Sequence, residues 1–359
     1  MSGPARVGVV GGGRRTEFLL RLAARAPEHL AVTGVAVRRP ERAAELAGTW
    51  GATTVATAEE LLTTRPDVVV AAVPWGAAPD VTRHLVGLGV PVLTETPPAP
   101  DLDGLRRLWA DVGSSGLVQV AEQYMLMPAH AVRLALTREG RIGRVTSVQV
   151  SSTHLYHAVS MIRRLLGVGF EAATVDARTF LSPLADPLGF DGWSGDMTPR
   201  ELGTTIATLD FGDGRTGLYD FTENQWFNPL RTKRLVVRGS LGEIVDDHLV
   251  RLVDPRTPVE SRLLRRHVGR DLDLEGLDLD HVSVDGEVRW RNPFFGARLS
   301  EDDLAVAAIL VEAARWGRGE GPAPYPLADG LQDHLLALAV EESARTRTTV
   351  VTGVEAWAG

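Results

Sequence analysis

The sequence contains no cysteine, a single lysine and no long apolar run, and each of these absences excludes a class of function. Without cysteine in its 359 residues, the chain has no disulfides, no thiolate metal ligands and no cysteine nucleophile. Lys233 is the only lysine among 38 basic residues, so a catalytic lysine would have to be that one. No apolar stretch is as long as a membrane span, and the first expected strand begins too near the N-terminus to follow a signal peptide. We therefore expect a cytoplasmic protein with no membrane partner.

Charge and size narrow the possibilities further. The net charge of −8 argues against nucleic acid as a partner, because its recognition depends on basic surfaces. A chain with 44% hydrophobic and 23% charged residues is ordinary for a globular protein, and its length is sufficient for two domains. No cluster of histidines and acids has the spacing of metal ligands, so no metal site is expected.

A strand, a glycine turn and a helix follow one another near the N-terminus. Residues 6–10 form a β-branched apolar run typical of a strand buried on both faces, and residues 17–25 have the apolar spacing of an amphipathic helix. The glycines at 11–13 join them. This order directs free backbone N–H groups and the positive end of a helix dipole at a pyrophosphate. Thr16 stands where the dinucleotide pattern has its third glycine, and the expected cofactor contacts here are Gly11, Gly13 and Thr16.

The remainder of the N-terminal half alternates between short strands and helices. Strands are expected at residues 31–37, 54–56, 67–73, 91–95 and 117–122, and helices at residues 41–50, 58–63, 79–87 and 102–112. This alternation predicts an α/β fold, a Rossmann domain with a doubly wound parallel sheet over residues 1–122. Ligands bind at the carboxyl ends of such strands, so we expect further cofactor contacts from Pro74, Trp75, Glu95 and Thr96.

Arginines follow the second strand, where NAD-binding proteins have an acidic residue for the ribose hydroxyls. Here Val37 is followed by Arg38 and Arg39. A guanidinium group binds phosphate through two parallel hydrogen bonds and suits the 2′-phosphate of NADP. We therefore predict NADP as the cofactor, with NAD less favoured. Arg14 and Arg15 follow the glycine turn and are expected to assist at the phosphates.

Residues 123–359 have a different pattern and are predicted to form a second domain. Helices are expected at residues 128–138, from about 156, at 304–316 and at 330–342, and strands at residues 145–151, 174–181, 204–211, 216–222, 234–238 and 348–351. Because strands dominate between the helices, we predict an α+β domain with an open, mostly antiparallel sheet that binds substrate. Residues 272–280 alternate between acid and leucine and are expected to form a solvated loop or hairpin.

Several stretches together resemble the Gfo/Idh/MocA oxidoreductases. They are VGVVGGG, DVVVAAVP, VPVLTETPPA at the place of the family's Glu-Lys-Pro, QYMLMPAHAVRLALTREGRIGRV, HAVSMIRRLLG and the tail PLADGLQDHLLALAVEESARTRTTV. The resemblance implies a Rossmann domain followed by an α/β domain whose open sheet assembles a homodimer or homotetramer. It also implies hydride transfer between a nicotinamide cofactor and a sugar, cyclitol or related small molecule.

The chain departs from this family at two of three residues that its enzymes commonly use. The resemblance implies that Thr96 replaces the lysine of Glu-Lys-Pro and that Thr153 replaces an aspartate four residues before the family histidine, which remains as His157. An imidazole titrates near neutral pH and serves as an acid or base. We predict as catalytic His157, Tyr156 and Tyr124, and as substrate-binding Thr153, His154, Arg163 and again Tyr124.

The favoured hypothesis is an NADP(H)-dependent oxidoreductase that acts on a small polar metabolite. Its substrate would be a sugar- or cyclitol-like alcohol or ketone, or an imine, whose basic nitrogen arrives already protonated and needs the lysine less. Two alternatives remain open. One is a redox-inactive dinucleotide-binding regulator, favoured by threonine at two catalytic positions, and the other is a non-redox enzyme that recycles a tightly held cofactor.

Overall fold

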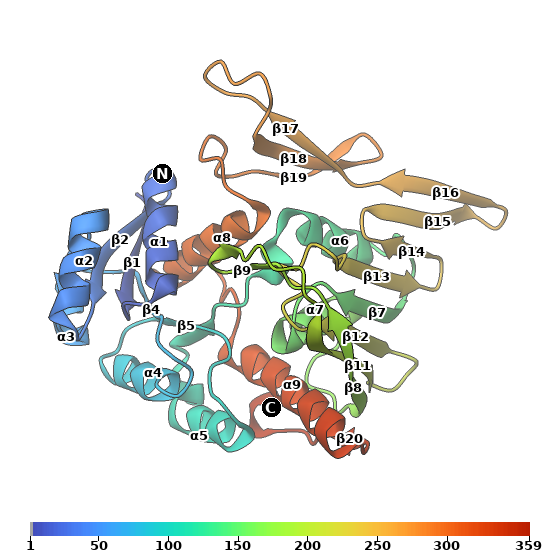
Figure 1. Cartoon of the computed structure of the whole chain (residues 1–359), viewed down its shortest axis with the longest axis horizontal. Helices are drawn as coiled ribbons and strands as arrows, with labels where there is room; N and C mark the ends of the chain where they lie inside the picture. Colours follow the sequence, from blue (N-terminus) through green and yellow to red (C-terminus); the bar gives the residue numbers. More distant parts are fainter. Residues whose placement is uncertain (1–2) are drawn as a thin grey trace.

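The computed structural model describes residues 3–359 and shows two domains side by side (Figure 1). The predicted fold class is confirmed, with a parallel sheet in the N-terminal half and a mostly antiparallel sheet in the C-terminal half. Within residues 3–359, no helix is both long and apolar enough to cross a membrane.

The N-terminal domain is a six-stranded parallel sheet in the order β3-β2-β1-β4-β5-β6. The strand order reverses between β1 and β4, and a crevice opens at their carboxyl ends. The elements are β1 (Ala5–Val10), α1 (Arg14–Arg25), β2 (Leu30–Ala36), α2 (Pro40–Trp50), β3 (Thr54–Val55), α3 (Ala58–Leu62), β4 (Val68–Ala71), α4 (Ala78–Gly87), β5 (Val92–Thr94), α5 (Leu102–Val112) and β6 (Val118–Val120).

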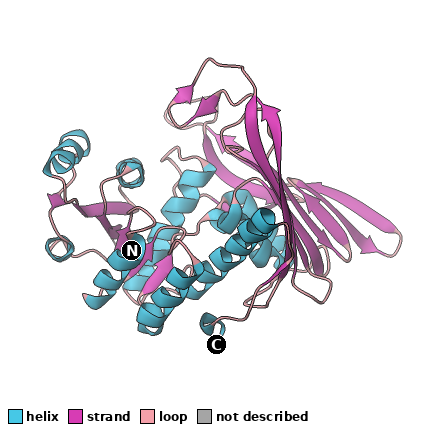
Figure 2. Ribbon diagram, turned by 60° about the horizontal axis from the view of Figure 1, so that its bottom comes forward, coloured by secondary structure: helices cyan, strands magenta, loops and turns pink. Residues whose placement is uncertain are grey.

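The C-terminal domain has a nine-stranded sheet in the order β16-β15-β14-β13-β7-β12-β11-β8-β20, antiparallel except where β7 pairs with β12. Figure 2 shows the helices gathered on one face of this sheet, toward the N-terminal domain, while the other face carries none. The elements are α6 (Pro128–Arg138), β7 (Val145–Ser151), α7 (Leu155–Leu166), β8 (Thr174–Leu184), β11 (Arg200–Asp210), β12 (Thr216–Thr222), β13 (Arg234–Gly239), β14 (Gly242–Val245), β15 (His248–Asp254), β16 (Thr257–Arg262), α8 (Glu301–Gly317), α9 (Leu327–Thr346) and β20 (Val350–Val351).

Two small sheets extend this domain. One joins β9 (Leu188–Gly189) to β10 (Gly192–Trp193), and the other joins β17 (Leu264–Val268), β18 (Asp278–Val284) and β19 (Glu287–Arg291). The region expected as a loop or hairpin at residues 272–280 is a loop up to residue 277, and strand β18 begins at Asp278. Leu272 and Leu274 are almost fully exposed in this loop, whereas Leu279 of β18 is buried, so only the strand part of the stretch contributes to the core.

Helix α8 belongs to the core of the N-terminal domain although it lies in the C-terminal third of the chain. Its apolar face, including Leu304 and Leu310, packs in one cluster with Val7 and Val9 of β1. The predicted boundary at residue 122 therefore leaves out one helix of the first domain. Sequence order could not reveal this, because an apolar stripe shows that a helix is buried and not which sheet covers it.

Candidate active site

Gly11 and Gly13 shape the turn between β1 and α1 in different ways. Gly11 has a φ of +129°, and a Cβ there would lie 2.0 Å from the carbonyl oxygen of Ala72, so only glycine lets the turn approach β4 this closely. Gly13 caps α1 without a side-chain hydrogen bond, and the space where its Cβ would stand is empty. The first N–H groups of α1 thus have room for a phosphate beside them.

Thr16 does not reach that space, which corrects its prediction as a cofactor contact. The helix begins at Arg14 rather than near Glu17, so Thr16 lies in its first turn. Its side chain is fully buried, and its hydroxyl donates a hydrogen bond to the carbonyl oxygen of Gly11 at 3.0 Å. Thr16 therefore holds the glycine turn in place and has no exposed atom for a ligand.

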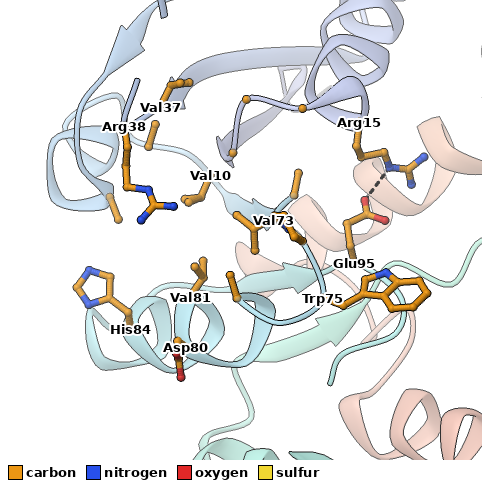
Figure 3. A pocket seen from close by; sticks show the side chains of 18 of the residues that line it. Val10, Arg15, Val37, Arg38, Val73, Trp75, Asp80, Val81, His84 and Glu95 are labelled. Carbon is orange, nitrogen blue, oxygen red and sulfur yellow. Dashed lines mark hydrogen bonds and ion pairs between the residues drawn. The ribbon is translucent and has the colours of Figure 1, made fainter. Parts of the chain in front are cut away.

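A cleft of about 1370 Å³ follows the carboxyl ends of the parallel strands, and this is more than a small drug-sized ligand requires. Figure 3 shows Arg38 and His84 on facing walls at one end and Arg15 with Glu95 at the other. Every other residue predicted to bind the cofactor lines it: Gly11, Gly13, Arg14, Arg15, Arg38, Arg39, Pro74, Trp75, Glu95 and Thr96.

The arginines of this cleft differ in their partners. Within residues 3–359, the exposed side chains of Arg38 and Arg39 form no hydrogen bond or ion pair with the protein. Their charges therefore remain available to a ligand at the end of the cleft next to β2. Three other arginines of the cleft are each paired with an acid: Arg14 with Asp191, Arg15 with Glu95 and Arg42 with Glu17.

His157 lines the same cleft as Thr96 and is held by a buried carboxylate. Its Nδ1 lies 2.6 Å from Oε2 of Glu122, whose side chain is only 3% exposed. The other Glu122 oxygen accepts the backbone N–H of Tyr124 at 3.1 Å. A carboxylate at this distance keeps the proton on Nδ1, which leaves Nε2 of the neutral ring as a proton acceptor.

Tyr124 and Tyr156 pack against His157 but do not line the cleft. Their ring centroids lie 4.6 Å and 4.5 Å from that of His157. Burial raises the pKa of Tyr124 to about 12 and also raises the pKa of Tyr156 well above its usual value. Phenols this reluctant to ionise are poor proton donors. The structure therefore places both tyrosines as supports of the His157 ring, not at the cleft surface where we expected them to act.

Two of the residues expected to bind substrate lie behind His157. Thr153 is fully buried, and its hydroxyl accepts the indole N–H of Trp226 at 3.4 Å. His154 lines a separate cavity together with Trp226, and burial lowers the pKa of His154 to about 3. Neither side chain lines the cleft, so these two predictions are corrected.

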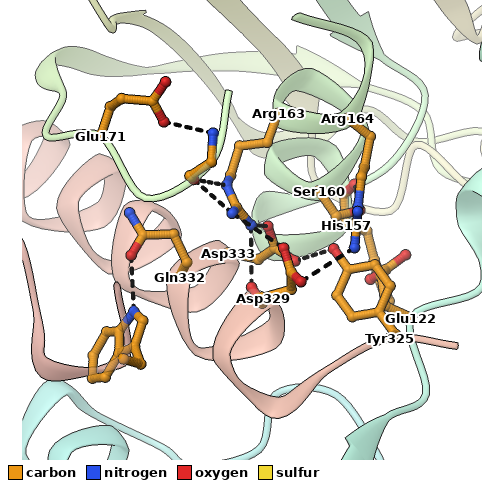
Figure 4. Close-up of polar contacts among 12 residues, drawn as sticks. Glu122, His157, Ser160, Arg163, Arg164, Glu171, Tyr325, Asp329, Gln332 and Asp333 are labelled. Atoms are coloured by element: carbon orange, nitrogen blue, oxygen red, sulfur yellow. Dashed lines mark hydrogen bonds and ion pairs between the residues drawn. The ribbon is translucent and has the colours of Figure 1, made fainter. Parts of the chain in front are cut away.

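Arg163 links α7 to α9 and is not a substrate ligand. Its side chain is 2% exposed and donates to Asp333 at 2.5 Å and to the carbonyl oxygen of Gly169 at 2.7 Å (Figure 4). A step of six residues from His157 turns a helix by roughly 240°, so the two side chains leave α7 on different faces. The prediction for Arg163 is therefore wrong, because its position in the motif serves packing.

Glu122 and Gln123 belong to the site although neither was predicted from the sequence. Gln123 lines the cleft, and both follow β6 at the edge of the sheet where ligands bind. The position of Glu122 at the carboxyl end of a parallel strand could have marked it as a site residue. The pairing of Glu122 with His157 could not be predicted, because it depends on how the chain turns at Tyr124–Leu126 into the second domain. No three His, Asp or Glu side chains among residues 3–359 are grouped to hold a metal ion.

Comparison with known families supports the resemblance inferred from the sequence. Residues 5–123 match the model of the Gfo/Idh/MocA family, described as an oxidoreductase family with an NAD-binding Rossmann fold. This match spans the N-terminal domain, from β1 to the residues that follow β6. A search of curated protein sequences gave no match.

Solved structures share the fold over nearly the whole chain. The WlbA dehydrogenase from Bordetella pertussis, in complex with NADH and UDP-GlcNAcA, has a TM-score of 0.67 and 17% identity, with 99% of each chain covered. A myo-inositol dehydrogenase from Corynebacterium glutamicum has a TM-score of 0.65 and 20% identity over 98% of this chain and 99% of that one. Levoglucosan dehydrogenase, in complex with NADH and levoglucosan, has a TM-score of 0.67 and 19% identity over 97% and 99%.

Proposed function

We propose that this chain, whose first domain matches the model of the Gfo/Idh/MocA family, is an NADP(H)-dependent oxidoreductase acting on a small polar metabolite. The observation that carries the proposal is one continuous cleft that contains both the glycine turn and His157. A nicotinamide dinucleotide bound there would supply a hydride acceptor or donor. The substrate is a sugar- or cyclitol-like alcohol or ketone, or an imine.

The residues present fit such a cofactor. Gly13 leaves the start of α1 open to a pyrophosphate, and any larger side chain there would fill that space. Arg38 and Arg39 line the cleft after β2 with unpaired guanidinium groups. The 2′-phosphate of NADP would pair with them, whereas the ribose hydroxyls of NAD lack an acidic partner at Val37. We therefore propose NADP over NAD.

His157 is the proposed proton acceptor and donor. In the direction of alcohol oxidation, Nε2 of His157 would accept the proton of the substrate hydroxyl, while a bound nicotinamide would supply the hydride acceptor. Glu122 stabilises the imidazolium that results, because its carboxylate lies 2.6 Å from Nδ1. The reverse direction returns the same proton to the product oxygen or nitrogen. A positioned acid or base of this kind contributes about 10²- to 10⁴-fold in rate.

Thr96 places no charge at the position where the resemblance expects lysine. A developing alkoxide is therefore stabilised less than it would be beside an ammonium group. An imine substrate is affected less, because its nitrogen already carries a proton. We infer that imines, or alcohols activated by other groups, react best at this site.

A single glycine tests the proposed cofactor site. In Gly13→Asp, the new Cβ meets no atom of the protein within 4 Å, so the fold should persist, while the side chain takes the phosphate's place and repels its charge. We expect loss of NADPH and NADH binding, measured by quenching of tryptophan fluorescence. Gly48→Asp, at a glycine of α2 with equally free space, is the matched control. Unchanged binding in Gly13→Asp would contradict the proposal.

A redox-inactive dinucleotide sensor is the second candidate. It is favoured by Thr96 and by Thr153, which is fully buried under Trp226 and offers no acid to the cleft. A sensor would bind NADPH as tightly but would leave its 340 nm absorbance unchanged with every alcohol, ketone and imine offered. A cofactor-recycling enzyme would convert substrate with no net absorbance change, which product analysis would reveal.

We also propose that the chain forms a homodimer through the helix-free face of the nine-stranded sheet. Phe180 of β8 and Ile206 of β11 are 55% and 48% exposed, and apolar side chains gathered on an uncovered sheet are typical of an interface. Light scattering after gel filtration would test this. Ile206→Asp should give monomers if this face forms the dimer.

A further inference from the structure

A small cavity lies beside Glu122, which lines it but does not line the cleft. Its volume is about 10 Å³, close to the least space that one water molecule occupies. The polar side chains that line it are Thr96, Glu122, Tyr156, Asp333 and His334. A buried water needs two to four polar partners, and this lining supplies them.

His334 on α9 is the unexplained member of this lining. Its ring is 6% exposed, and neither ring nitrogen has a hydrogen-bond partner in the protein. Burial lowers the pKa of His334 to about 4, although the nearby Pro100 backbone and Asp101 carboxylate act to raise it. A neutral imidazole has one N–H and one lone pair, so it both accepts and donates a proton. Pro100 and Asp101 are exposed, so the ring lies between the cavity and the surface.

The other groups facing Glu122 are not free to take its proton. Asp333 is occupied by the Arg163 guanidinium at 2.5 Å and by the Tyr325 hydroxyl at 2.5 Å. Burial raises the pKa of Tyr325 and of Tyr156 well above the ordinary value, which disfavours their ionised forms. Arg164 lies over the Tyr325 ring, and the backbone N–H of Tyr124 already donates to the other Glu122 oxygen. His334 is the remaining group able to relay a proton.

We propose that one water fills this cavity and that Glu122, this water and His334 form a proton path from His157 to the surface at Asp101. This inference rests on the proposed role of His157. After Nε2 has accepted the substrate proton, the imidazolium that Glu122 first stabilises releases its Nδ1 proton to Glu122, from there to the water, and from the water to one nitrogen of His334. The second His334 nitrogen releases its own proton to solvent near Asp101. Each group ends with its original number of protons, and no electron is transferred. His157 and His334 each end with the proton on the other ring nitrogen, so both rings return to the starting tautomer before the next cycle.

The path lets the site exchange a proton while a ligand covers the cleft. Glu122 and His334 would be positioning and relay groups, since neither lines the cleft. Without the path, the proton of His157 would have to leave through the cleft itself. A ligand in the cleft should therefore slow proton exchange of His157 if the proton leaves through the cleft, and should not slow it if the proton leaves through His334.

The experiment measures exchange of the His157 Nδ1 proton with solvent by ¹⁵N-resolved NMR, with NADPH present and absent. His334→Gln keeps a donor and an acceptor for the water but has no tautomer to relay a proton, and His334→Phe removes both. We expect exchange to slow at least about tenfold in both variants, a barrier about 1.4 kcal/mol higher, and to stay fast with NADPH in the unaltered protein. If exchange of the His157 Nδ1 proton slowed in His334→Phe but not in His334→Gln, the effect would come from altered packing, and the proposed relay through His334 would be wrong.

A high-resolution crystal structure completes the test. The unaltered chain and His334→Gln should each show one water within hydrogen-bond distance of Glu122, and His334→Phe should show none. An empty cavity in the unaltered chain would overturn the proposal. Neither measurement uses turnover, so failure to find a substrate would count against the proposed function and leave this result standing. Thermal unfolding of each variant verifies that the fold is retained.

Discussion

The two ends of the cleft are built from different kinds of side chain. The end next to β2 presents exposed arginines without partners, Arg38 and Arg39. The other end presents His157, held from behind by a carboxylate that is 3% exposed. The first end is open and positively charged, whereas the second is enclosed and presents an imidazole hydrogen-bonded to a buried carboxylate. We infer that binding energy comes mainly from the first end and chemistry from the second.

This contrast explains how a site can lose a lysine and keep its architecture. Thr96 changes one side chain of the cleft wall, while the glycine turn and the His157–Glu122 pair are fixed by the backbone and by burial. Catalytic power depends on groups whose interactions strengthen in the transition state, and cofactor affinity does not depend on those groups. The two properties are therefore separable by mutation.

The largest expected effect is at the enclosed end. His157→Ala removes the proposed acid and base, so kcat should fall about 10²- to 10⁴-fold, measured at 340 nm with a substrate that the unaltered chain turns over. The dissociation constant for NADPH should not change. His84→Ala, on the cleft wall opposite Arg38, is the control and should leave kcat intact. An equal fall in kcat in His157→Ala and His84→Ala would contradict the assignment of the chemistry to the enclosed end.

The next effect belongs to the open end. Arg38→Ala should weaken NADPH binding by about 1.5–3 kcal/mol, the usual strength of a charged hydrogen bond, and should leave NADH binding unchanged. Arg14→Ala serves as the control, because Arg14 lies at the glycine turn, away from β2, so any loss of affinity there should be the same for NADPH and NADH. The dissociation constants of both variants for NADPH and for NADH are measured by titration. Equal affinity of the unaltered chain for NADPH and NADH would end the NADP proposal.

Two buried histidines outside the cleft should make the stability of the fold depend on pH. Burial lowers the pKa of His154 to about 3 and that of His334 to about 4, below about 6.5 in an unfolded chain. Between these values the unfolded state binds more protons, so their stabilisation is complete above pH 6.5 and is lost as the pH falls toward 4. The loss approaches about 1.4 kcal/mol per pH unit for each group.

Urea unfolding at pH 7, 5.5 and 4.5 measures this slope. His334→Gln should flatten it, whereas His84→Gln should not, because the His84 side chain is 53% exposed. A slope unaffected by His334→Gln would show that this histidine does not stay neutral in the folded protein.

The smallest effect is expected from restoring charge at Thr96. Thr96→Lys should raise activity on alcohols or ketones by about tenfold or less, because one ammonium group is added to an otherwise unchanged wall. Thr96→Arg adds the charge without a proton that can be given up, so it separates electrostatic help from proton donation. If neither variant gains on any such substrate, imine or non-redox chemistry is favoured.

How far the sequence predicts the structure depends on whether a feature is local. The glycine turn, the alternating strands and the arginines after Val37 are all recognised from neighbouring residues, and the cleft is lined by those arginines as expected. Thr16 and Arg163 were misjudged because a motif position does not state which way a side chain points. Both are buried in the structure.

The pairing of Glu122 with His157 lies outside any local pattern. These residues are 35 positions apart and lie on either side of the predicted domain boundary, and the packing of α7 against the turn at Tyr124–Leu126 brings them together. The cavity lined by His334 is still more remote, because α9 reaches it from the last part of the chain. Contacts of this kind follow from tertiary structure and have no signature in spacing.

The return of α8 to the first domain has a consequence for how the protein can be divided. A fragment ending at residue 122 would expose the apolar surface that Leu304 and Leu310 cover in the whole chain, and it should aggregate or stay unfolded. Cofactor-domain exchange between relatives would therefore require two crossover segments. Because α8 links the two halves, we expect them to unfold together. Substrate specificity should therefore be changed by substitutions in loops, which leave this packing intact, and not by exchanging whole domains between relatives.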